Sequence, residues 1–112
     1  MNSNTSIEMV SLALDAAIMR QTAIAYNLAN SNSINSKSLE VNFEQQLNHH
    51  ESIIPAQDAS LIQPFYQVSE KKISIDEQMA LNVQNSTHYR ALIKGLNQEL
   101  AIMKMALQGN NQ

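Results

Sequence analysis

The residues best able to do chemistry in this sequence are few and poorly arranged for it. His49, His50 and Glu51 form the one cluster of metal-binding residue types, but neighbours in sequence point in different directions on a helix or strand. Such a run is not a chelate by itself, because metal ligands normally come in spaced pairs. Asp76 and Glu77 are adjacent at a predicted helix start, where carboxylates compensate the helix dipole. We interpret the histidines as solvated and the carboxylates as a helix-terminal pair.

Nucleophilic and phosphate-binding patterns are also absent from the sequence. Gly95 and Gly109 are its two glycines, so it contains neither a Gly-rich phosphate loop nor a Gly-flanked serine nucleophile. Without cysteine there is no thiolate chemistry and no disulfide. The six methionines are more typical of core and interface packing than of a ligand set. We therefore expect a protein that is not an enzyme, with no catalytic residue, cofactor or metal.

Charge and hydropathy exclude further classes of partner. The net charge is -3 and the basic residues are scattered, with only Lys71 and Lys72 adjacent. This distribution lacks the basic patch that binds nucleic acid or anionic lipid. No run approaches 18 apolar residues, so we expect no direct membrane insertion. The polar start, residues 1–6, lacks the pattern of a cleaved secretory signal.

The C-terminal third, residues 74–108, is predicted to form one long amphipathic helix. Ser74 and Glu77 form a capping box at its start, and Gly109 stands where a left-handed residue often ends a helix. Apolar residues recur at spacings of four and three, the a/d rhythm of a coiled coil. These seam residues are Tyr89, Ile93, Leu96, Leu100, Met103 and Leu107. A helix of about 50 Å cannot be covered by one small core, so we expect part of this seam to contact another molecule.

Residues 5–30 are predicted to form the partner helix, capped by Thr5 or Ser6. The same rhythm recurs there, interrupted by Gln21. Its seam consists of Ile7, Val10, Leu14, Ala17, Ile24 and Leu28. We therefore predict a single mainly α domain over 1–112, in which the long N- and C-terminal helices pair as an antiparallel-type coiled-coil hairpin.

The middle of the chain, residues 31–73, is predicted to be an irregular connection. The Asn- and Ser-rich run 27–36 ends the first helix, since these side chains compete for backbone hydrogen bonds. Leu39, Val41 and Phe43 alternate with polar residues, which indicates a short extended or β stretch near 38–43. Pro55 and Pro64 prevent a continuous helix over 48–70.

The end of the first helix resembles a signature of the bacterial flagellar rod and hook family. There N-[IL]-A-N is followed closely by T-P-G-[YF]-K. The matching residues here are Asn27, Leu28, Ala29, Asn30 and Lys37. Ser33 stands for the Thr, and Ile34, Asn35 and Ser36 replace the Pro, the Gly and the aromatic. Asn35 is the mildest change, because Asn is the next-best residue for a left-handed turn.

Two further segments extend the resemblance. Residues 73–80, which include Asp76 and Met79, are similar to the V-[DN]-[IL]-D-x-E-M-A segment of rod proteins of the FlgB type, with Gln78 at the Glu position. Tyr89 opens the Y-x-A-L that follows, and residues 39–44 resemble the extended piece after that family's first loop. The order and spacing of these segments make the combination more specific than any one of them.

The resemblance implies a structural subunit of the proximal rod of the flagellar basal body, which transmits torque. Such subunits leave the cell through the flagellar type III export apparatus without a cleaved signal peptide. They assemble helically through their terminal helices with other copies, with other rod proteins and with the adaptor of the membrane ring. The seam residues of the two helices would form the assembly contacts. We expect the free monomer to be partly unfolded and to gain helix on assembly.

Two other classes fit the helical pattern. One is an inner-rod or needle-type subunit of a virulence type III secretion system, which also has paired terminal helices. The other is a helical-hairpin adaptor or chaperone that forms a closed dimer. Sedimentation separates the second class, because a closed dimer is a discrete species whereas a rod subunit forms an open series.

Overall fold

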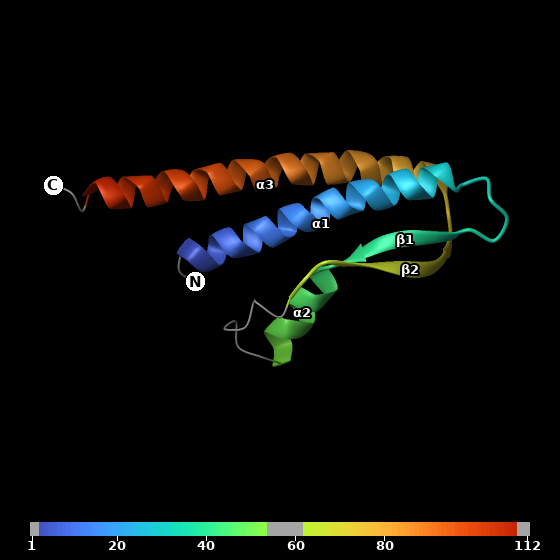
Figure 1. Cartoon of the computed structure of the whole chain (residues 1–112), viewed down its shortest axis with the longest axis horizontal. Coiled ribbons are helices and arrows are strands. Elements are labelled where there is room, and N and C mark those ends of the chain that lie inside the picture. The colour runs from blue at the N-terminus through green and yellow to red at the C-terminus, as the bar shows by residue number, and fades with distance from the viewer. Residues whose placement is uncertain (1–2, 54–61, 110–112) are drawn as a thin grey trace.

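The structure is a computed structural model that describes the backbone of residues 3–53 and 62–109 (Figure 1). Side chains are described for residues 5–49 and 62–109. The order of elements is α1 (Ser3–Ala29), β1 (Lys37–Asn42), α2 (Glu44–Ile53), β2 (Phe65–Lys72) and α3 (Ile75–Gly109).

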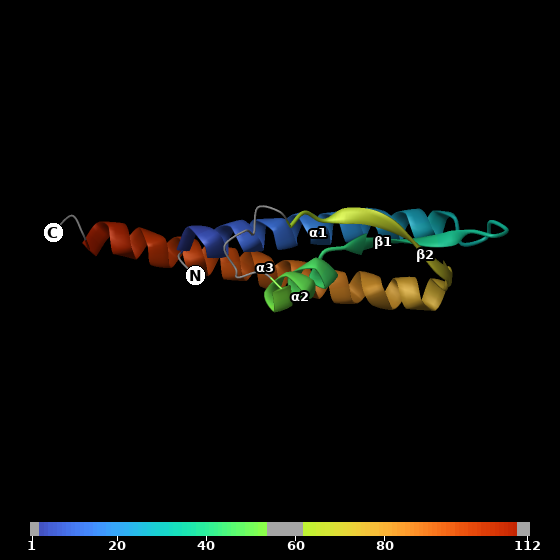
Figure 2. The ribbon, with the colours of Figure 1, turned by 90° about the horizontal axis from the view of Figure 1, so that it is seen from below.

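The two terminal helices run antiparallel and lie side by side in both ribbon views (Figures 1 and 2). The predicted mainly helical fold with paired N- and C-terminal helices is therefore confirmed. At 35 residues, α3 is longer than α1 with 27, and its C-terminal end extends past the start of α1 (Figure 1). The molecule is elongated, with principal extents of 65 × 30 × 15 Å.

The start of α3 is capped as the sequence predicts. The Glu77 N–H donates to Ser74 Oγ at 3.4 Å, and the Gln78 N–H donates to the Ser74 carbonyl at 3.0 Å. The predicted left-handed stop at Gly109 is wrong, because Gly109 is the last residue of α3 and has no positive φ. Gly109 is exposed, and it continues the helix to the last described residue. At the other end of the chain, α1 begins at Ser3, before the predicted caps at Thr5 and Ser6.

The middle of the chain is more regular than the predicted irregular connection. The extended stretch near 38–43 is β1, and it pairs antiparallel with β2, with Leu39 opposite Val68 and Val41 opposite Tyr66. The short helix α2 begins directly after β1, where the Leu47 N–H donates to the Phe43 carbonyl at 3.2 Å. Both β2 and α2 are thus corrections to the predicted path over 48–70, of which residues 54–61 lie outside the described part.

The apolar core lies between α1 and the β1–β2 hairpin rather than between the two long helices. It is formed by Ala16, Ala23, Val41, Phe43 and Ile62. Phe43 is one of the two largest fully buried side chains. The small residues on α1 let the hairpin approach closely, and the alternation along β1 directs its apolar residues inward. An adjacent side of α1 contacts α3, where the Ala17 carbonyl accepts from Asn85.

Candidate functional site

The buried side chain of Asn27 joins three elements at one junction. Its Nδ2 donates to the Leu39 carbonyl at 2.9 Å, and its Oδ1 accepts the Leu39 N–H at 2.7 Å. The same Nδ2 donates to Gln78 Oε1 of α3 at 3.0 Å. Asn27 is 1% exposed and Gln78 is 4% exposed, so these bonds form away from solvent. The junction therefore fixes how α1, β1 and α3 lie relative to one another.

Asn30 ends α1 through its own side chain. Its Nδ2 donates to the Tyr26 carbonyl at 2.8 Å, and its backbone N–H donates to the same carbonyl at 3.1 Å. Ser31 adds a further cap, since its hydroxyl donates to the Leu28 carbonyl at 2.9 Å. These groups occupy carbonyls at the helix end, which confirms that the Asn- and Ser-rich run stops the helix.

Asn35 has a φ of 63°, the one positive φ among the described residues. The resemblance places a glycine of the rod and hook signature at this position. Asn tolerates the left-handed conformation better than other non-glycine residues do. The turn between α1 and β1 therefore has its left-handed residue where that signature has glycine.

The other motif residues do not converge on one site. Lys37 forms an exposed ion pair with Glu70, at 3.1 Å between Nζ and Oε2. Met79 and Tyr89 are exposed on α3, as are Asp76 at its start and Leu28 and Ala29 at the end of α1. Among the motif residues, Asn27 makes buried contacts between elements and Asn30 caps the end of α1, whereas the Lys37 ion pair is exposed.

The α1 seam faces inward for most of its length. Ile24 and Ala17 are buried, and the residues toward the N-terminus are partly buried. Those residues are Ile7, Val10 and Leu14. Leu28 departs from the predicted seam, because it is 36% exposed at the helix end.

The α3 seam is divided between two faces. Leu96 and Met103 are partly buried, whereas the other seam residues are exposed. These exposed residues are Tyr89, Ile93, Leu100 and Leu107. The reason is that α3 turns a more polar stripe, with Gln78 and Asn85, toward α1, and that its last turns extend past the start of α1. Part of the predicted α3 seam therefore does not pack on α1.

Gln78 and Asn85 are the functional candidates that the apolar pattern missed. Both are buried against α1, where the Asn85 Nδ2 donates to the Ala17 carbonyl at 2.9 Å. They are seven residues apart, and Leu92 continues the same heptad position. A heptad count that included amides would have found this stripe. Buried amides of this kind specify helix register.

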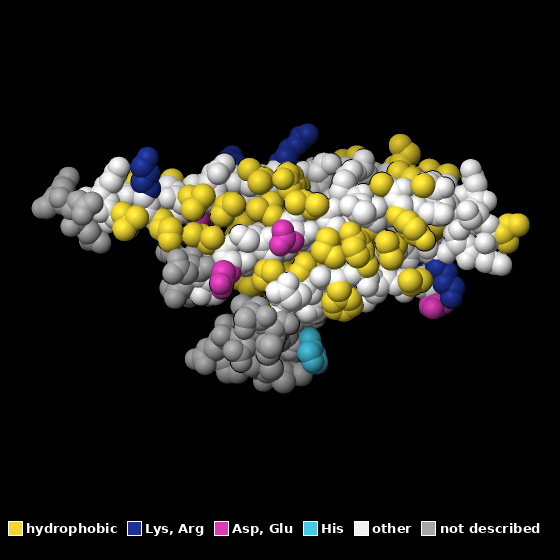
Figure 3. Space-filling view, in the orientation of Figure 1, with side chains coloured by type: hydrophobic (Ala, Val, Ile, Leu, Met, Phe, Trp, Pro, Cys, Tyr) yellow, Lys and Arg dark blue, Asp and Glu magenta, His cyan; other side chains and the backbone are white. Residues whose placement is uncertain are grey.

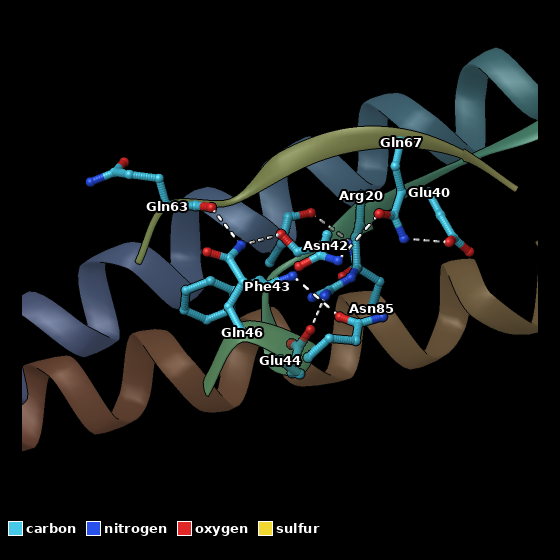
Figure 4. A network of polar contacts seen from close by, with 11 residues as sticks. Arg20, Glu40, Asn42, Phe43, Glu44, Gln46, Gln63, Gln67 and Asn85 are labelled. Atoms are coloured by element: carbon cyan, nitrogen blue, oxygen red, sulfur yellow. Dashed lines mark hydrogen bonds and ion pairs between the residues drawn. The ribbon is translucent and has the colours of Figure 1, made fainter. Parts of the chain in front are cut away.

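Polar contacts also join α2 to α1 and the two strands of the hairpin to each other (Figure 4). Arg20 of α1 forms an ion pair with Glu44 at the start of α2. Gln67 of β2 accepts from Asn42 at 3.2 Å and donates to Glu40 at 2.6 Å. Because Asn42 and Glu40 are both on β1, these side-chain bonds join the two strands. Gln46 of α2 donates to the Gln63 carbonyl at 2.7 Å. This bond holds α2 against the segment that leads into β2.

A groove of about 870 Å³ runs between the hairpin and the N-terminal half of α3, with α1 along its floor. Its α3 wall includes Glu77, Leu81, Gln84, His88 and Ala91, which lie on one helix face. Its hairpin wall includes apolar residues of β1 and the charged residues Glu40, Lys71 and Lys72. Its mixed, open lining suits a peptide segment better than a small molecule.

The described side chains do not gather into a metal site. Nowhere in that part of the chain do three His, Asp or Glu residues converge. His49 lies on α2, whereas His88 lies on the groove face of α3. The side chains of His50 and Glu51 lie outside the described residues. Across the described helices, none is both long and apolar enough to cross a bilayer.

No family model matches the chain, and no curated protein does. The functional assignment therefore depends on the motifs and on the geometry.

Proposed function

We propose that the chain is a structural subunit of the proximal rod in the bacterial flagellar basal body. Three segments carry its resemblance to rod proteins: the end of the first helix, the extended piece near residue 39 and the start of the last helix. The observation that carries the proposal is that these three segments meet at Asn27, through its bonds to Leu39 and Gln78. Three segments that resemble rod proteins and are far apart in the sequence thus contact one another at one junction.

The turn after α1 gives further support. Asn35 is left-handed at the position where the family signature has glycine, so the backbone there meets the same conformational demand. The replacement of the Pro and the aromatic by Ile34 and Ser36 leaves this turn intact. Ile34 is 91% exposed, so its side chain is available to a neighbouring molecule.

The exposed residues at the C-terminal end of α3 support the proposal that the chain assembles with other molecules. Apolar side chains there are exposed, as Figure 3 shows for the end of the molecule where α3 extends beyond α1. These side chains are Leu100, Ile102, Met105 and Leu107, each at least 46% exposed. Exposed apolar residues in such number mark a surface that another molecule covers.

Deletion of the gene tests the proposal. A rod subunit is required for the axial structure, so the deletion strain should lose swimming and lack hooks and filaments. A plasmid copy of the gene should restore both. A deletion strain that swims as well as its parent would reject the rod assignment.

Among the alternatives, a closed-dimer adaptor makes a different prediction for the same α3 surface. A dimer buries its apolar patch once and stops, whereas a rod subunit adds copies without closing. Sedimentation velocity over a range of concentrations separates them, because a single dimer species at all concentrations would favour the adaptor.

A further inference from the structure

The groove between the hairpin and α3 and the exposed end of α3 are complementary in length. The groove extends along α3 from Glu77 to Ala91, about 20 Å at 1.5 Å per residue. The bonds of Asn27 to Gln78 and of Asn85 to Ala17 set the antiparallel register, which places Ser3 level with roughly residue 100 of α3. The end beyond α1, residues 100–109, is thus about 14 Å long and fits within the groove.

One face of this α3 end has the chemistry to enter such a groove. Leu100, Lys104 and Leu107 follow one another at spacings of four and three, so they lie on one stripe. Leu100 is 46% exposed and Leu107 is 64% exposed. Lys104 has no ion-pair partner in the described part of the chain, and residues 100–109 contain no acidic residue.

The groove offers matching groups. Leu81 on its α3 wall is 39% exposed, and Leu39 and Val41 supply apolar atoms from β1. Glu40 on the hairpin wall accepts from Gln67, and among the described residues it pairs with no cation. Lys71 and Lys72 also line the groove, and Glu77 adds a second carboxylate from its α3 wall. A lysine flanked by leucines therefore finds apolar walls and two carboxylates, Glu40 and Glu77, that pair with no cation among the described residues.

We propose that this groove binds the C-terminal end of α3 from a second copy of the chain. Because the two surfaces differ and lie at different places along the molecule, the contact is heterologous and leaves a free groove and a free α3 end on each pair. Successive copies then add with a stagger of roughly 30 Å, the distance along α3 from residue 104 to the middle of the groove. This inference rests on the proposed rod function only for its biological setting.

Disulfide cross-linking between introduced cysteines tests the contact. The sequence contains no cysteine, so no native thiol competes in the reaction. Purified Leu81→Cys and Leu100→Cys proteins are mixed in equal amounts and oxidised. Disulfide formation requires Cα atoms within about 7 Å, so the mixed product should exceed either homodimer several-fold. Val83→Cys is the matched control, because Val83 is 67% exposed on α3 and does not line the groove. Equal cross-linking through Val83, or a predominant Leu100→Cys homodimer, would overturn the proposal.

A charge exchange gives an independent readout. Lys104→Glu and Glu40→Lys should each weaken self-association measured by sedimentation by about fivefold. The double variant, with both charges exchanged, should recover most of this loss. Unchanged association in both single variants would overturn the proposal, as would additive weakening in the double variant.

These outcomes are separable from those of the rod proposal. Specific cross-linking of a protein whose deletion leaves cells swimming would support the contact and reject the rod function. A non-swimming deletion strain together with no specific cross-link would retain the function and reject this contact.

Discussion

The side chain of Asn27 pairs with the backbone of Leu39 as a neighbouring strand would, donating to its carbonyl and accepting from its N–H. This satisfies both polar groups of Leu39 on the edge of β1 that β2 does not cover. The bond from Asn27 to Gln78 adds α3 to the same junction. The buried amide of Asn27 therefore helps to place the hairpin relative to α1 and α3.

Replacing Asn27 by Ala should destabilise the fold by about 3 kcal/mol, because Leu39 would keep two unpaired backbone groups away from water. Asn27→Asp should destabilise at least as much, since a buried carboxylate would face the Leu39 carbonyl and Gln78 Oε1. Urea unfolding followed by circular dichroism measures both. Asn30→Ala is the control and should cost only about 1 kcal/mol, as it removes one exposed cap. Equal losses in Asn27→Ala and Asn30→Ala would show that the junction is unimportant.

The left-handed turn makes a second prediction. Asn35→Val should cost about 1–2 kcal/mol, because a β-branched residue is disfavoured at a φ of 63°. Asn35→Gly should stay within about 0.5 kcal/mol of the parent. Glycine favours this positive φ in the folded state, but it also raises the conformational entropy of the unfolded chain, and the two effects oppose each other. Asn32→Val serves as the control in the same loop. If Asn35→Val is as stable as Asn32→Val, the turn has a different backbone.

The position of the core predicts a large loss of stability for one phenylalanine and a small one for the other. Phe43 is 2% exposed beneath the hairpin, whereas Phe65 is 48% exposed on β2. Phe43→Ala should cost about 3–5 kcal/mol through lost burial and a cavity. Phe65→Ala should cost below about 1 kcal/mol. Thermal unfolding compares them directly, and similar losses would place the core elsewhere.

Helix content should rise with protein concentration. The end of α3 beyond α1 has exposed apolar side chains and packs against no other element among the described residues, and a short isolated helical end is marginal in water. Far-ultraviolet circular dichroism per residue should therefore strengthen as copies associate, and a groove-blocking variant such as Glu40→Lys should reduce the increase. A signal that is independent of concentration, with cooperative melting of a monomer, would contradict assembly-coupled folding.

Much of this fold was predictable from local sequence. The capping Ser74 and the four-three spacing defined both long helices, and the alternation of Leu39, Val41 and Phe43 defined β1. In contrast, β2 ends in Glu70, Lys71 and Lys72 and buries little, so it has no periodic apolar face to detect. Its pairing with β1 is a long-range contact that local pattern does not specify.

The candidate site was only partly predictable for a related reason. The motif comparison identified Asn27, but not its bonds to Leu39 and Gln78, because these partners are distant in sequence. The α3 seam was assigned from apolar residues alone, whereas the face on α1 is built around Gln78 and Asn85. The groove depends on where the hairpin packs, which follows from tertiary contacts.

We propose above that the chain is a rod subunit that assembles through the end of α3. The most direct measurement is the amount of the chain in purified flagellar basal bodies, from cells expressing the parent, Leu100→Asp or Gln98→Asp. Leu100→Asp would bury an unpaired carboxylate in the contact, at a cost of several kcal/mol, whereas Gln98 lies about 160° away around the helix. We predict that the parent and Gln98→Asp proteins co-purify with basal bodies and support swimming, and that Leu100→Asp does neither. Full swimming of Leu100→Asp cells, or basal bodies that lack the parent chain, would contradict the account.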